Sequence, residues 1–515
     1  MKHPFELLRV LSVGVAAGAL LVGCGVCGAE FIGQSRPGMC SAAADSGPPA
    51  NEDAPPIPPG PPGGPPPPSA PCGFTTGPEP FALPLVAGAP TGAFDETSGQ
   101  VACATGGRSF SFYLLDMNGD QLPDLVVDGS CDDVTVGTSA LLVYPNTGKG
   151  FGASQRFALP ALPTTAGCVA DTFVDINGDL KPDLVVTSLC GDPTVGTSRW
   201  LVYLNGAGGF AASSQAFALP SGFGPGSFVK LEAATAVCGS MNQPAFAFFD
   251  LTGDSKPDLV VTSSCDDVSV GTSAWSLYAG NGTGVAPSPA PFPLPISPSA
   301  GQMGAFASPM SGNITCANGP ASLRYALLDF DGNTTLDLMV TSACDDPTVG
   351  TTQWSVYPSS GSSFAANATS VALPVLAAAP AAALDTLGSS VACSGVAGNL
   401  AFTTVDANGD LRPDLVVTSA CDDPTVGVSH WILYPNTKTG FGPAQAYTLP
   451  EITLGATTSA PAGLTGTLDC SGASSAAFVT GYLAPPSLDL IVTATCDDAT
   501  VGASRWLLFA GACSG

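Results

Sequence analysis

The chain has 515 residues, of which 41 are acidic and 14 basic, and its formal net charge is −27. Such an acidic balance argues against nucleic acid as a partner, because phosphate binding requires clustered Lys and Arg. His3 and His430 are the only histidines, which disfavours most Ser/His and Cys/His catalysis, and no nucleophile elbow or nucleotide-binding loop is found.

The N-terminal residues have the pattern of an export signal. Lys2 and Arg9 precede an apolar stretch, residues 10–22, that is too short for a membrane span. Because Leu-Val-Gly-Cys also resembles the bacterial lipoprotein box, we predict a signal peptide over residues 1–23 and lipidation of Cys24. Cys27 is a second candidate, and an ordinary secreted protein is the alternative. The prediction places the chain in the bacterial cell envelope, at the outer membrane or cell surface.

Residues 24–71 are predicted to be a proline-rich linker that follows the lipid anchor. Residues 48–71 contain 13 prolines in 24 positions, a composition that favours extended polyproline II and cannot pack a core. At about 3.1 Å per residue, this stretch would hold the next domain up to roughly 70 Å from its anchor.

Residues 72–515 consist of six similar units. The clearest unit begins with an Asp-rich loop, residues 175–183, continues through an apolar strand to Cys190, and ends with a Thr-Val-Gly run before Trp200. The last Asp of each loop is Asp124, Asp183, Asp258, Asp337, Asp414 or Asp489, so the spacings are 59, 75, 79, 77 and 75 residues. Such periods, with short strands and Gly/Pro-rich turns, are typical of radially repeated blades.

The fold class that follows is all-β, a β-propeller of four-stranded blades. In the second unit we expect strands at residues 172–175, 183–187, 199–204 and 216–219, and helical periodicity is absent almost everywhere. Six blades are favoured over seven, because six complete units are present. The segment near residues 80–84 matches the fourth strand of other units, and we expect it to supply the strand that the last unit lacks and so close the ring.

Cysteines occur as one pair in every unit. We predict disulfides between the entry to the first strand and the exit from the second, each contributing about 3 kcal/mol by the loop-entropy model. A further bond between Cys72 and Cys513 would latch the ring, which leaves Cys27 and Cys40 as a last pair. Zinc is disfavoured, since no C-x-x-C pair recurs. The predicted pairs within units are Cys103 with Cys131, Cys168 with Cys190, Cys238 with Cys265, Cys316 with Cys344, Cys393 with Cys421, and Cys470 with Cys496.

The Asp-rich loops carry the strongest functional signal. Oxygen side chains at loop positions 1, 3, 5 and 9, with a backbone carbonyl near position 7, suit hard and flexible Ca²⁺ coordination. The predicted ligands are Asp116, Asn118, Asp120 and Asp124; Asp175, Asn177, Asp179 and Asp183; Asp250, Thr252, Asp254 and Asp258; Asp329, Asp331, Asn333 and Asp337; Asp406, Asn408, Asp410 and Asp414. The third loop is poorer because Thr252 is a neutral hydroxyl, and we expect no Ca²⁺ at residues 481–489, which keep only the last Asp.

The run Asp-x-Asn-Gly-Asp-x-x-Pro-Asp-Leu-Val-Val resembles the FG-GAP/VCBS repeats of integrin α-subunit β-propellers and their bacterial relatives. The resemblance covers about residues 79–515. It implies a propeller with Ca²⁺ in the turns of one face and ligand-binding loops on the other. The regular cysteines and the Cys-Asp-Asp turns depart from the family pattern, so an integrin-like ligand is not implied.

The acidic turns that follow each second strand would lie on the face opposite the calcium loops. They could bind cations or basic ligands, but we favour a role in turn structure, since Asp side chains readily cap turn amides. The five tryptophans share one repeat position, with Leu141 in the remaining unit, which favours a place in the blade core. The turn residues are Asp132, Asp133, Asp192, Asp266, Asp267, Asp345, Asp346, Asp422, Asp423, Asp497 and Asp498.

The second unit breaks the repeat pattern. From Pro160 to Cys168 its connection spans 8 residues, against 18 to 21 in the other five units. We expect a notch in the rim beside this unit, near Thr165 and Asp192.

The function expected from these features is calcium-supported binding or adhesion on the cell surface, without catalysis. About five Ca²⁺, mainly structural, are the expected cofactor, and an unknown protein or glycan on the face opposite the calcium loops is the expected partner. The alternatives are a calcium-dependent lectin and a propeller-fold hydrolase. The Asp-x-Thr-Val-Gly run does not match a sialidase Asp-box, because its Asp-to-Gly spacing is four rather than two.

Overall fold

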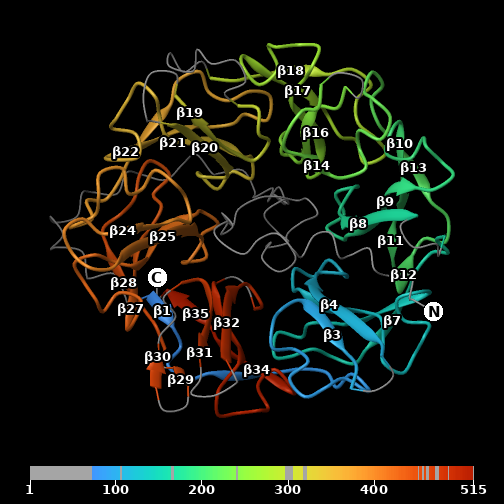
Figure 1. The fold of residues 1–515 in the computed structure, drawn as a ribbon, viewed down its shortest axis with the longest axis horizontal. Coiled ribbons are helices and arrows are strands. Elements are labelled where there is room, and N and C mark those ends of the chain that lie inside the picture. Colours follow the sequence, from blue (N-terminus) through green and yellow to red (C-terminus); the bar gives the residue numbers. More distant parts are fainter. Residues whose placement is uncertain are drawn as a thin grey trace, which may run out of the picture.

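The computed structural model describes residues 72–513, apart from 105–106, 164–167, 239–241, 296–305, 317–321, 451, 455–456, 460–462, 470–474 and 485–486. Every regular element in these residues is a β-strand, which confirms the all-β prediction. The sheets lie side by side around a common centre, as in a β-propeller (Figure 1). No helix in the described residues is long and apolar enough to cross a membrane.

Each repeat unit forms one sheet, and the sheets are numbered here by their units. The first sheet has the strand order β7 (Gln155–Ala158), β6 (Ala140–Tyr144), β5 (Asp124–Asp128), β4 (Ser109–Leu115) and β3 (Gly99–Ala102), and β7 is also joined to β12 (Gly209–Phe210) and then β11 (Asn205–Gly206). The second has the order β13 (Gln215–Ala218), β10 (Arg199–Tyr203), β9 (Asp183–Leu189) and β8 (Val169–Val174).

The third and fourth sheets have five strands each, in sequence order. The third contains β14 (Glu232–Ala233), β15 (Ala245–Phe249), β16 (Asp258–Ser263), β17 (Ala274–Tyr278) and β18 (Ala290–Pro293). The fourth contains β19 (Ser311–Thr315), β20 (Ser322–Leu328), β21 (Asp337–Ser342), β22 (Gln353–Tyr357) and β23 (Thr369–Ala372).

The fifth and sixth sheets include strands from both ends of the described chain. The fifth has the order β24 (Ser390–Ala392), β25 (Asn399–Val405), β26 (Asp414–Ser419), β27 (His430–Tyr434), β28 (Gln445–Thr448), β1 (Cys72–Phe74) and β35 (Gly511–Cys513). The sixth has the order β2 (Glu79–Ala82), β34 (Arg505–Phe509), β33 (Asp489–Ala494), β32 (Ser475–Gly481) and β31 (Thr465–Asp469). A small hairpin, β29 (Ile452–Leu454) with β30 (Thr457–Ser459), stands apart.

The prediction of four strands per unit holds only for the second sheet. In the other five sheets, a short extra strand (β3, β14, β19, β24 or β31) pairs with the first predicted strand. The reason is the length of the preceding connection. A connection of 18 to 21 residues can fold back along the sheet, whereas the 8 positions from Pro160 to Cys168 leave little chain for another strand.

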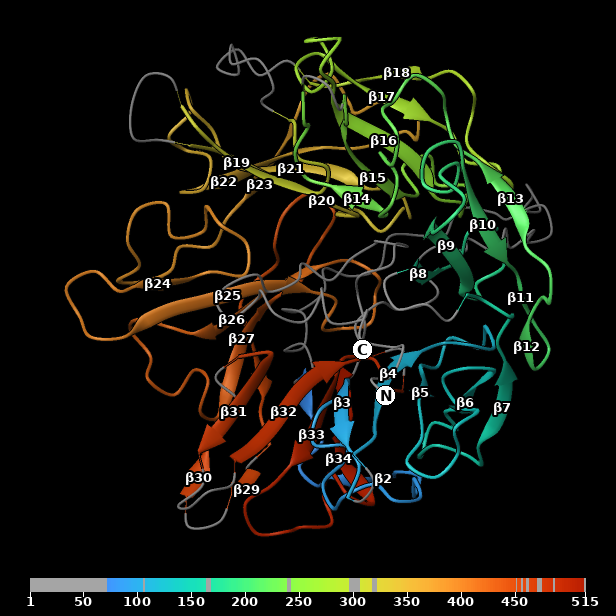
Figure 2. The same cartoon turned by 45° about the vertical axis from the view of Figure 1, so that its right-hand side comes forward.

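The N-terminal part of the described chain completes the last sheet, as the sequence predicts for residues near 80–84. Strand β2 pairs antiparallel with β34, so that Phe81 lies opposite Trp506, and Figure 2 shows the two strands side by side. The preceding strand, β1, does something the sequence did not predict. It pairs antiparallel with β35 and parallel with β28, and therefore joins both ends of the described chain to the fifth sheet.

Five of the six predicted disulfides within units are observed, and so is the predicted bond between Cys72 and Cys513. The bonds within units span 22 to 28 residues, whereas Cys72 and Cys513 are separated by 441. Multiple disulfides are weakly consistent with an extracellular location. The observed pairs within units are Cys103 with Cys131, Cys168 with Cys190, Cys238 with Cys265, Cys316 with Cys344, and Cys393 with Cys421.

The sixth predicted pair within a unit is only half covered by the described residues. Cys496 follows β33 and packs against the apolar cluster shared by the fifth and sixth sheets, but its predicted partner, Cys470, lies outside the described residues. Cys24, Cys27 and Cys40 lie outside them as well. The bond from Cys496 to Cys470 and the pairing of Cys27 with Cys40 therefore stay predictions.

The apolar core lies between neighbouring sheets. The described residues form six clusters, each of which combines side chains from two consecutive sheets, and one cluster joins the sixth sheet to the first. The five tryptophans are fully buried, as expected for blade-core residues. An aromatic ring from another part of the cluster packs edge-on against four of them, as Phe441 does against Trp354 at a centroid distance of 5.6 Å.

Candidate metal centres

The five predicted calcium loops have one backbone conformation in common. Each connects two antiparallel strands, for example β25 and β26. Loop position 4 is always a glycine with positive φ, and position 6 is never glycine, yet its φ lies between 66° and 73° in every loop. Side chains such as Leu rarely adopt this conformation, and its repetition points to a functional constraint on the loop. The residues at position 6 are Gln121, Leu180, Ser255, Thr334 and Leu411.

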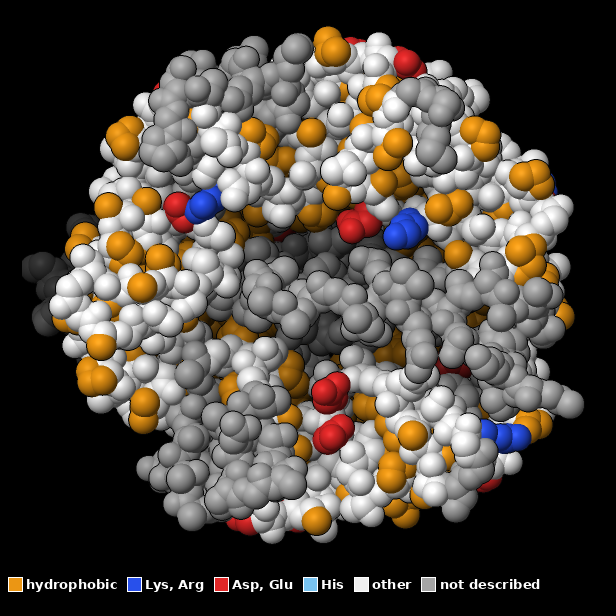
Figure 3. Space-filling view, viewed as in Figure 1, with side chains coloured by type: hydrophobic (Ala, Val, Ile, Leu, Met, Phe, Trp, Pro, Cys, Tyr) orange, Lys and Arg blue, Asp and Glu red, His pale blue; other side chains and the backbone are white. Residues whose placement is uncertain are grey.

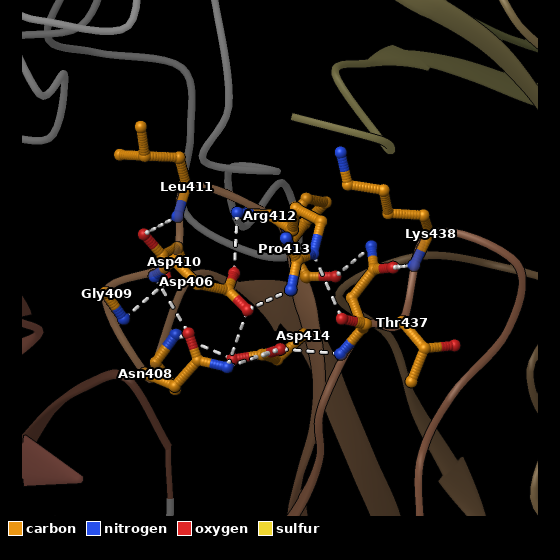
Figure 4. Close-up of polar contacts among 12 residues, drawn as sticks. Asp406, Asn408, Gly409, Asp410, Leu411, Arg412, Pro413, Asp414, Thr437 and Lys438 are labelled. Carbon is orange, nitrogen blue, oxygen red and sulfur yellow. Dashed lines mark hydrogen bonds and ion pairs between the residues drawn. The ribbon is translucent and has the colours of Figure 1, made fainter. Parts of the chain in front are cut away.

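The first Asp of each loop organises the turn. In the fifth loop, Asp406 Oδ1 accepts the backbone N–H of Gly409 at 2.7 Å, and Oδ2 accepts that of Leu411 at 3.0 Å (Figure 4). The same pair of bonds, to the residues three and five positions on, forms in the other four loops. These bonds hold the residue at position 6 in its strained conformation and turn the loop around the first carboxylate.

The last Asp of each loop is fully buried and connects the loop to the end of the third predicted strand of its unit. Its Oδ1 accepts the backbone N–H of the residue 22 positions later, at 2.7 to 2.8 Å, in all five loops. The contact joins the two ends of neighbouring strands at the same edge of the sheet. The last carboxylate therefore supports the fold of its sheet as well as the loop.

An asparagine at the receiving position extends this contact to a neighbouring sheet in three units, and sequence reasoning missed it. Asn205 Nδ2 donates to the carbonyl of Met117 at 3.0 Å, and Asn146 and Asn436 make the equivalent bond to Leu483 and Phe330. The Tyr-x-Asn run at the end of the third predicted strand in these units was the available signal.

Burial and mutual repulsion make these carboxylates unfavourable as bare anions. Burial, together with the charges of Asp410 and Asp406, raises the pKa of Asp414 to about 8, although backbone N–H bonds act to lower it. The last Asp of the other loops behaves in the same way, with its pKa raised to about 6 or 7. A bound cation would favour the ionised form of every such group.

The fourth loop brings its carboxylates closest together. Oxygens of Asp329, Asp331 and Asp337 lie within 4.8 Å of one another, which is a spacing suited to ligands around one small cation. In the fifth loop position 3 is Asn408 instead. Its Nδ2 donates to Asp410 at 3.1 Å and to Asp414 at 3.4 Å, so the amide lies among the carboxylates (Figure 4). Rotation of the amide would place its oxygen in the same position.

The residues present therefore fit Ca²⁺. All the side-chain donors are oxygens, three of them are carboxylates in each loop, and Ca²⁺ accepts six to eight oxygen ligands in flexible geometry. In the third loop the Thr252 hydroxyl makes a 3.5 Å contact with Asp250, and the weaker Ca²⁺ binding expected of this loop stays a prediction. When bound, Ca²⁺ would neutralise the clustered charges and fix the two strands that the loop joins.

The sixth loop differs from the others. Asp489 is fully buried, and its Oδ2 accepts the backbone N–H of Ala484 at 2.8 Å. Residues 485–486 lie outside the described part of the loop, and no second carboxylate occurs between Gly481 and Asp489. The prediction that this loop binds no Ca²⁺ stays a prediction.

No protein-family model matches the chain, and no curated protein matches it. The solved structures to which it is similar in fold include two of low identity. One is the pore of the Photorhabdus luminescens Tc holotoxin with the TccC3 mutation D651A, at 15% identity and a TM-score of 0.41 over 77% of this chain and 14% of the toxin chain. The other is the Dos1 propeller, at 12% identity and a TM-score of 0.27 over 79% and 81% of the two chains. This chain thus spans only a small part of the toxin.

The second Asp of each acidic turn accepts hydrogen bonds from other residues of the same turn. Asp133 accepts hydrogen bonds from the backbone N–H and the hydroxyl of Thr135, at 2.8 and 2.6 Å. These two bonds, together with the contact from Arg156, lower the pKa of the Asp133 carboxyl to about 2. The equivalent Asp caps its turn in the same way in all six units. The geometry agrees with the structural role that the sequence favours for these residues. Asp192, expected near the notch, also pairs with Arg199, and Thr165 lies outside the described residues.

Proposed function

We propose that this chain is a calcium-loaded, six-bladed β-propeller of the FG-GAP/VCBS type that acts by binding rather than by catalysis. The observation that carries the proposal is the common conformation of the five loops, in which one carboxylate accepts two backbone N–H bonds and a second, fully buried carboxylate lies beside it. Five repetitions of one costly arrangement are best explained by one ligand, and the oxygen donors favour Ca²⁺.

The count of six blades is supported by the way the core is shared. The six apolar clusters join first to second, second to third, and so on to sixth and first, so that each of the six sheets has a partner on both sides. The pairing of β2 with β34 supplies the sixth sheet with the outer strand it would otherwise lack. The six repeat units in residues 72–515 agree with this count.

The role of Ca²⁺ is proposed to be structural in the first place. The last Asp of each loop holds a residue at the end of the third predicted strand, and Asn146, Asn205 and Asn436 then extend this contact to the neighbouring sheet. An ion that fixes the carboxylate would therefore stabilise both a hairpin and the junction beside it. At a free concentration 100 times the Kd, one site would contribute about 2.7 kcal/mol.

Display on the cell surface completes the proposal. The disulfides suit an oxidising compartment, and the proline-rich residues before Cys72 suit a spacer between a lipid anchor at Cys24 and the propeller. Incorporation of a labelled fatty acid into the wild-type chain, but not into the Cys24→Ser variant, is the expected result. Equal labelling of the Cys24→Ser and Cys27→Ser variants with the wild type would contradict a lipid anchor at either position.

Thermal unfolding tests the calcium proposal. The full chain, melted with excess Ca²⁺ and with a chelator, is expected to lose several degrees of stability on chelation, and excess Mg²⁺ should restore little of it because Mg²⁺ demands near-ideal octahedral geometry. An unchanged melting temperature in chelator would mean that the five loops are turns without a metal, and the proposal would be withdrawn.

A further inference from the structure

The junction between the first and second sheets departs from the other five at two strand positions. One position belongs to the earlier unit of each junction and lies four residues after the last Asp of its loop. The other belongs to the following unit and lies four residues before the first residue of its loop. At the first junction both positions are acidic, Asp128 on β5 and Asp171 on β8. The other junctions combine a buried Thr with a buried aromatic residue: Thr187, Thr262, Thr341, Thr418 and Thr493 with Phe246, Tyr325, Phe402, Phe478 and Phe112.

At four of the other junctions, the long connection that precedes the later sheet contacts the buried Thr, and the first junction has no such long connection. At the second junction, the Thr187 hydroxyl donates to the carbonyl of Val229, at 2.8 Å, in the long connection that precedes the third sheet. Phe228, next to Val229, is fully buried in the apolar cluster between the second and third sheets. At three further junctions, the hydroxyls of Thr262, Thr341 and Thr493 donate in the same way to a backbone carbonyl of the following connection. The connection before the second sheet is shorter by at least 10 residues, and the chain places two carboxylates where the other junctions have a Thr and an aromatic ring.

Asp128 and Asp171 face each other across this junction. Tyr113 lies opposite Val126 on the paired strands β4 and β5, and Asp128 is two residues further along, on the same side of the sheet. Tyr113, Val126 and Phe173 belong to the cluster between the two sheets, and the Tyr113 and Phe173 rings are 6.0 Å apart. Asp171 is two residues from Phe173 along β8 and therefore lies on the same side of its sheet. Both acidic positions thus lie beside the two rings, and, after burial, the charge of Asp171 also raises the pKa of Asp128.

The groups at this junction have unused polar atoms. Tyr113 is only 8% exposed, yet its hydroxyl forms no hydrogen bond with any described residue, and its charged neighbours are Asp128 and Asp171. Neither Asp takes part in an ion pair with another described residue. By exposed area Asp171 is exposed and Asp128 half-buried, although burial by the surrounding chain raises the pKa of both carboxyls. Figure 3 shows acidic side chains near the inner edge of the ring on this face.

The oxygen atoms of these three side chains favour one class of ligand. Two carboxylates and one phenol are too few for Ca²⁺, which takes six to eight oxygens. An ammonium group instead offers three N–H donors, which match two acceptor-only carboxylates and the oxygen of the Tyr113 hydroxyl. We propose that Asp128, Asp171 and Tyr113 form a site for a primary ammonium group, which is either a lysine side chain of a partner or a small alkylamine. The site rests on the binding role proposed above, for which it names the ligand class.

Calorimetric titration of the calcium-loaded full chain tests the site. The probes are N-acetyl-lysine methylamide, its uncharged analogue N-acetyl-norleucine methylamide, and n-butylamine, with tetramethylammonium chloride as a control for ionic strength. We expect the lysine amide to bind and the norleucine amide not to bind. Tighter binding of the lysine amide than of n-butylamine would identify a side chain as the natural source, and equal binding would identify a small amine.

Variants separate this site from the rest of the molecule. Asp128→Asn with Asp171→Asn should weaken lysine-amide binding by about tenfold or more, because both charged acceptors are lost, while Asp266→Asn in an exposed turn should leave it unchanged. If the double variant does not fold, Asp171→Asn alone serves, since residue 171 is exposed. Equal binding of the two amides, undiminished binding by the Asn variants, or loss of one bound Ca²⁺ in them would overturn the proposal. The calcium-dependent melt is measured on the same samples, so failure of the calcium proposal is seen separately.

Discussion

Removal of the bond between Cys72 and Cys513 should destabilise the ring more than removal of a bond within one sheet. The bond links β1 and β35, the first and last strands of the described chain, which also pair with each other. Without it, β35 would be held by its three-residue pairing with β1 and by the Ser487 hydroxyl, which donates to the carbonyl of Gly511. Strand β1 would be tied to the propeller mainly by its pairing with β28. The matched control opens a bond within the first sheet, so we compare the Cys72→Ala, Cys513→Ala double variant with the Cys103→Ala, Cys131→Ala double variant.

The magnitude follows from the length of the closed loop. With separations of 441 and 28 residues, the loop-entropy model gives about 6 kcal/mol for the terminal bond and about 3.5 kcal/mol for the bond in the first sheet. The first figure is an upper bound, because the other disulfides shorten the loop that it closes. We expect the terminal variant to be the less stable of the two by about 2 kcal/mol.

Equilibrium urea unfolding in excess Ca²⁺ provides the comparison, and hydrogen exchange read by mass spectrometry locates the opening. The terminal variant should lose protection first in β1, β35 and β2, whereas the control should lose it near β3 and β5. Equal stabilities, or unchanged protection of β1 and β35, would refute the argument that this bond holds the ring closed.

Three further changes have defined outcomes. Trp354→Ala should lower the free energy of unfolding in urea by about 3 to 5 kcal/mol, because the side chain is fully buried and donates to the carbonyl of Leu384 at 2.8 Å. Trp354→Leu should lower it by less, since Leu141 occupies the equivalent position in the first unit. Thr252→Asp should strengthen Ca²⁺ binding to the third loop in a competitive chelator titration, and a weaker affinity would be evidence against coordination there. The pKa of Asp128 is raised to about 6 by burial and by Asp171, so its charged form destabilises the folded chain above pH 6, by roughly 1 to 2 kcal/mol. Urea unfolding at saturating Ca²⁺ should show this destabilisation shrinking as the pH falls through about 6 and disappearing only at about pH 4, near the ordinary pKa of an unfolded Asp. The Asp128→Asn variant should lack this part of the pH dependence.

The sequence predicted the parts of the fold that rest on local patterns. Repeated loops, strands and cysteine spacings are short-range features, and the observed disulfides and the pairing of β2 with β34 follow from them. The short extra strands, such as β3, were missed because the connections that form them carry no clear strand pattern. The parallel pairing of β1 with β28 was missed for a different reason, since it joins residues far apart in the sequence.

The candidate site was predictable to a similar extent. The loop carboxylates come from one motif, whereas the bond from Asn205 to Met117 connects two sheets and has no counterpart within a single repeat. Comparison of the units identified the short connection that precedes the second sheet, but not the acidic pair at the junction beside it. Asp128 and Asp171 stand in different units, and only their meeting at one junction identifies them as a pair.

The number of Ca²⁺ ions bound by the folded chain tests the central claim most directly. Native mass spectrometry of the full chain in volatile buffer with Ca²⁺, and again after chelation, should give five ions and then none. The Asp489→Asn variant, changed in the sixth loop, should still bind five, and the Asp337→Asn variant should bind four. Absence of bound Ca²⁺ from the folded wild-type chain would contradict the account, whatever the stability of the ring.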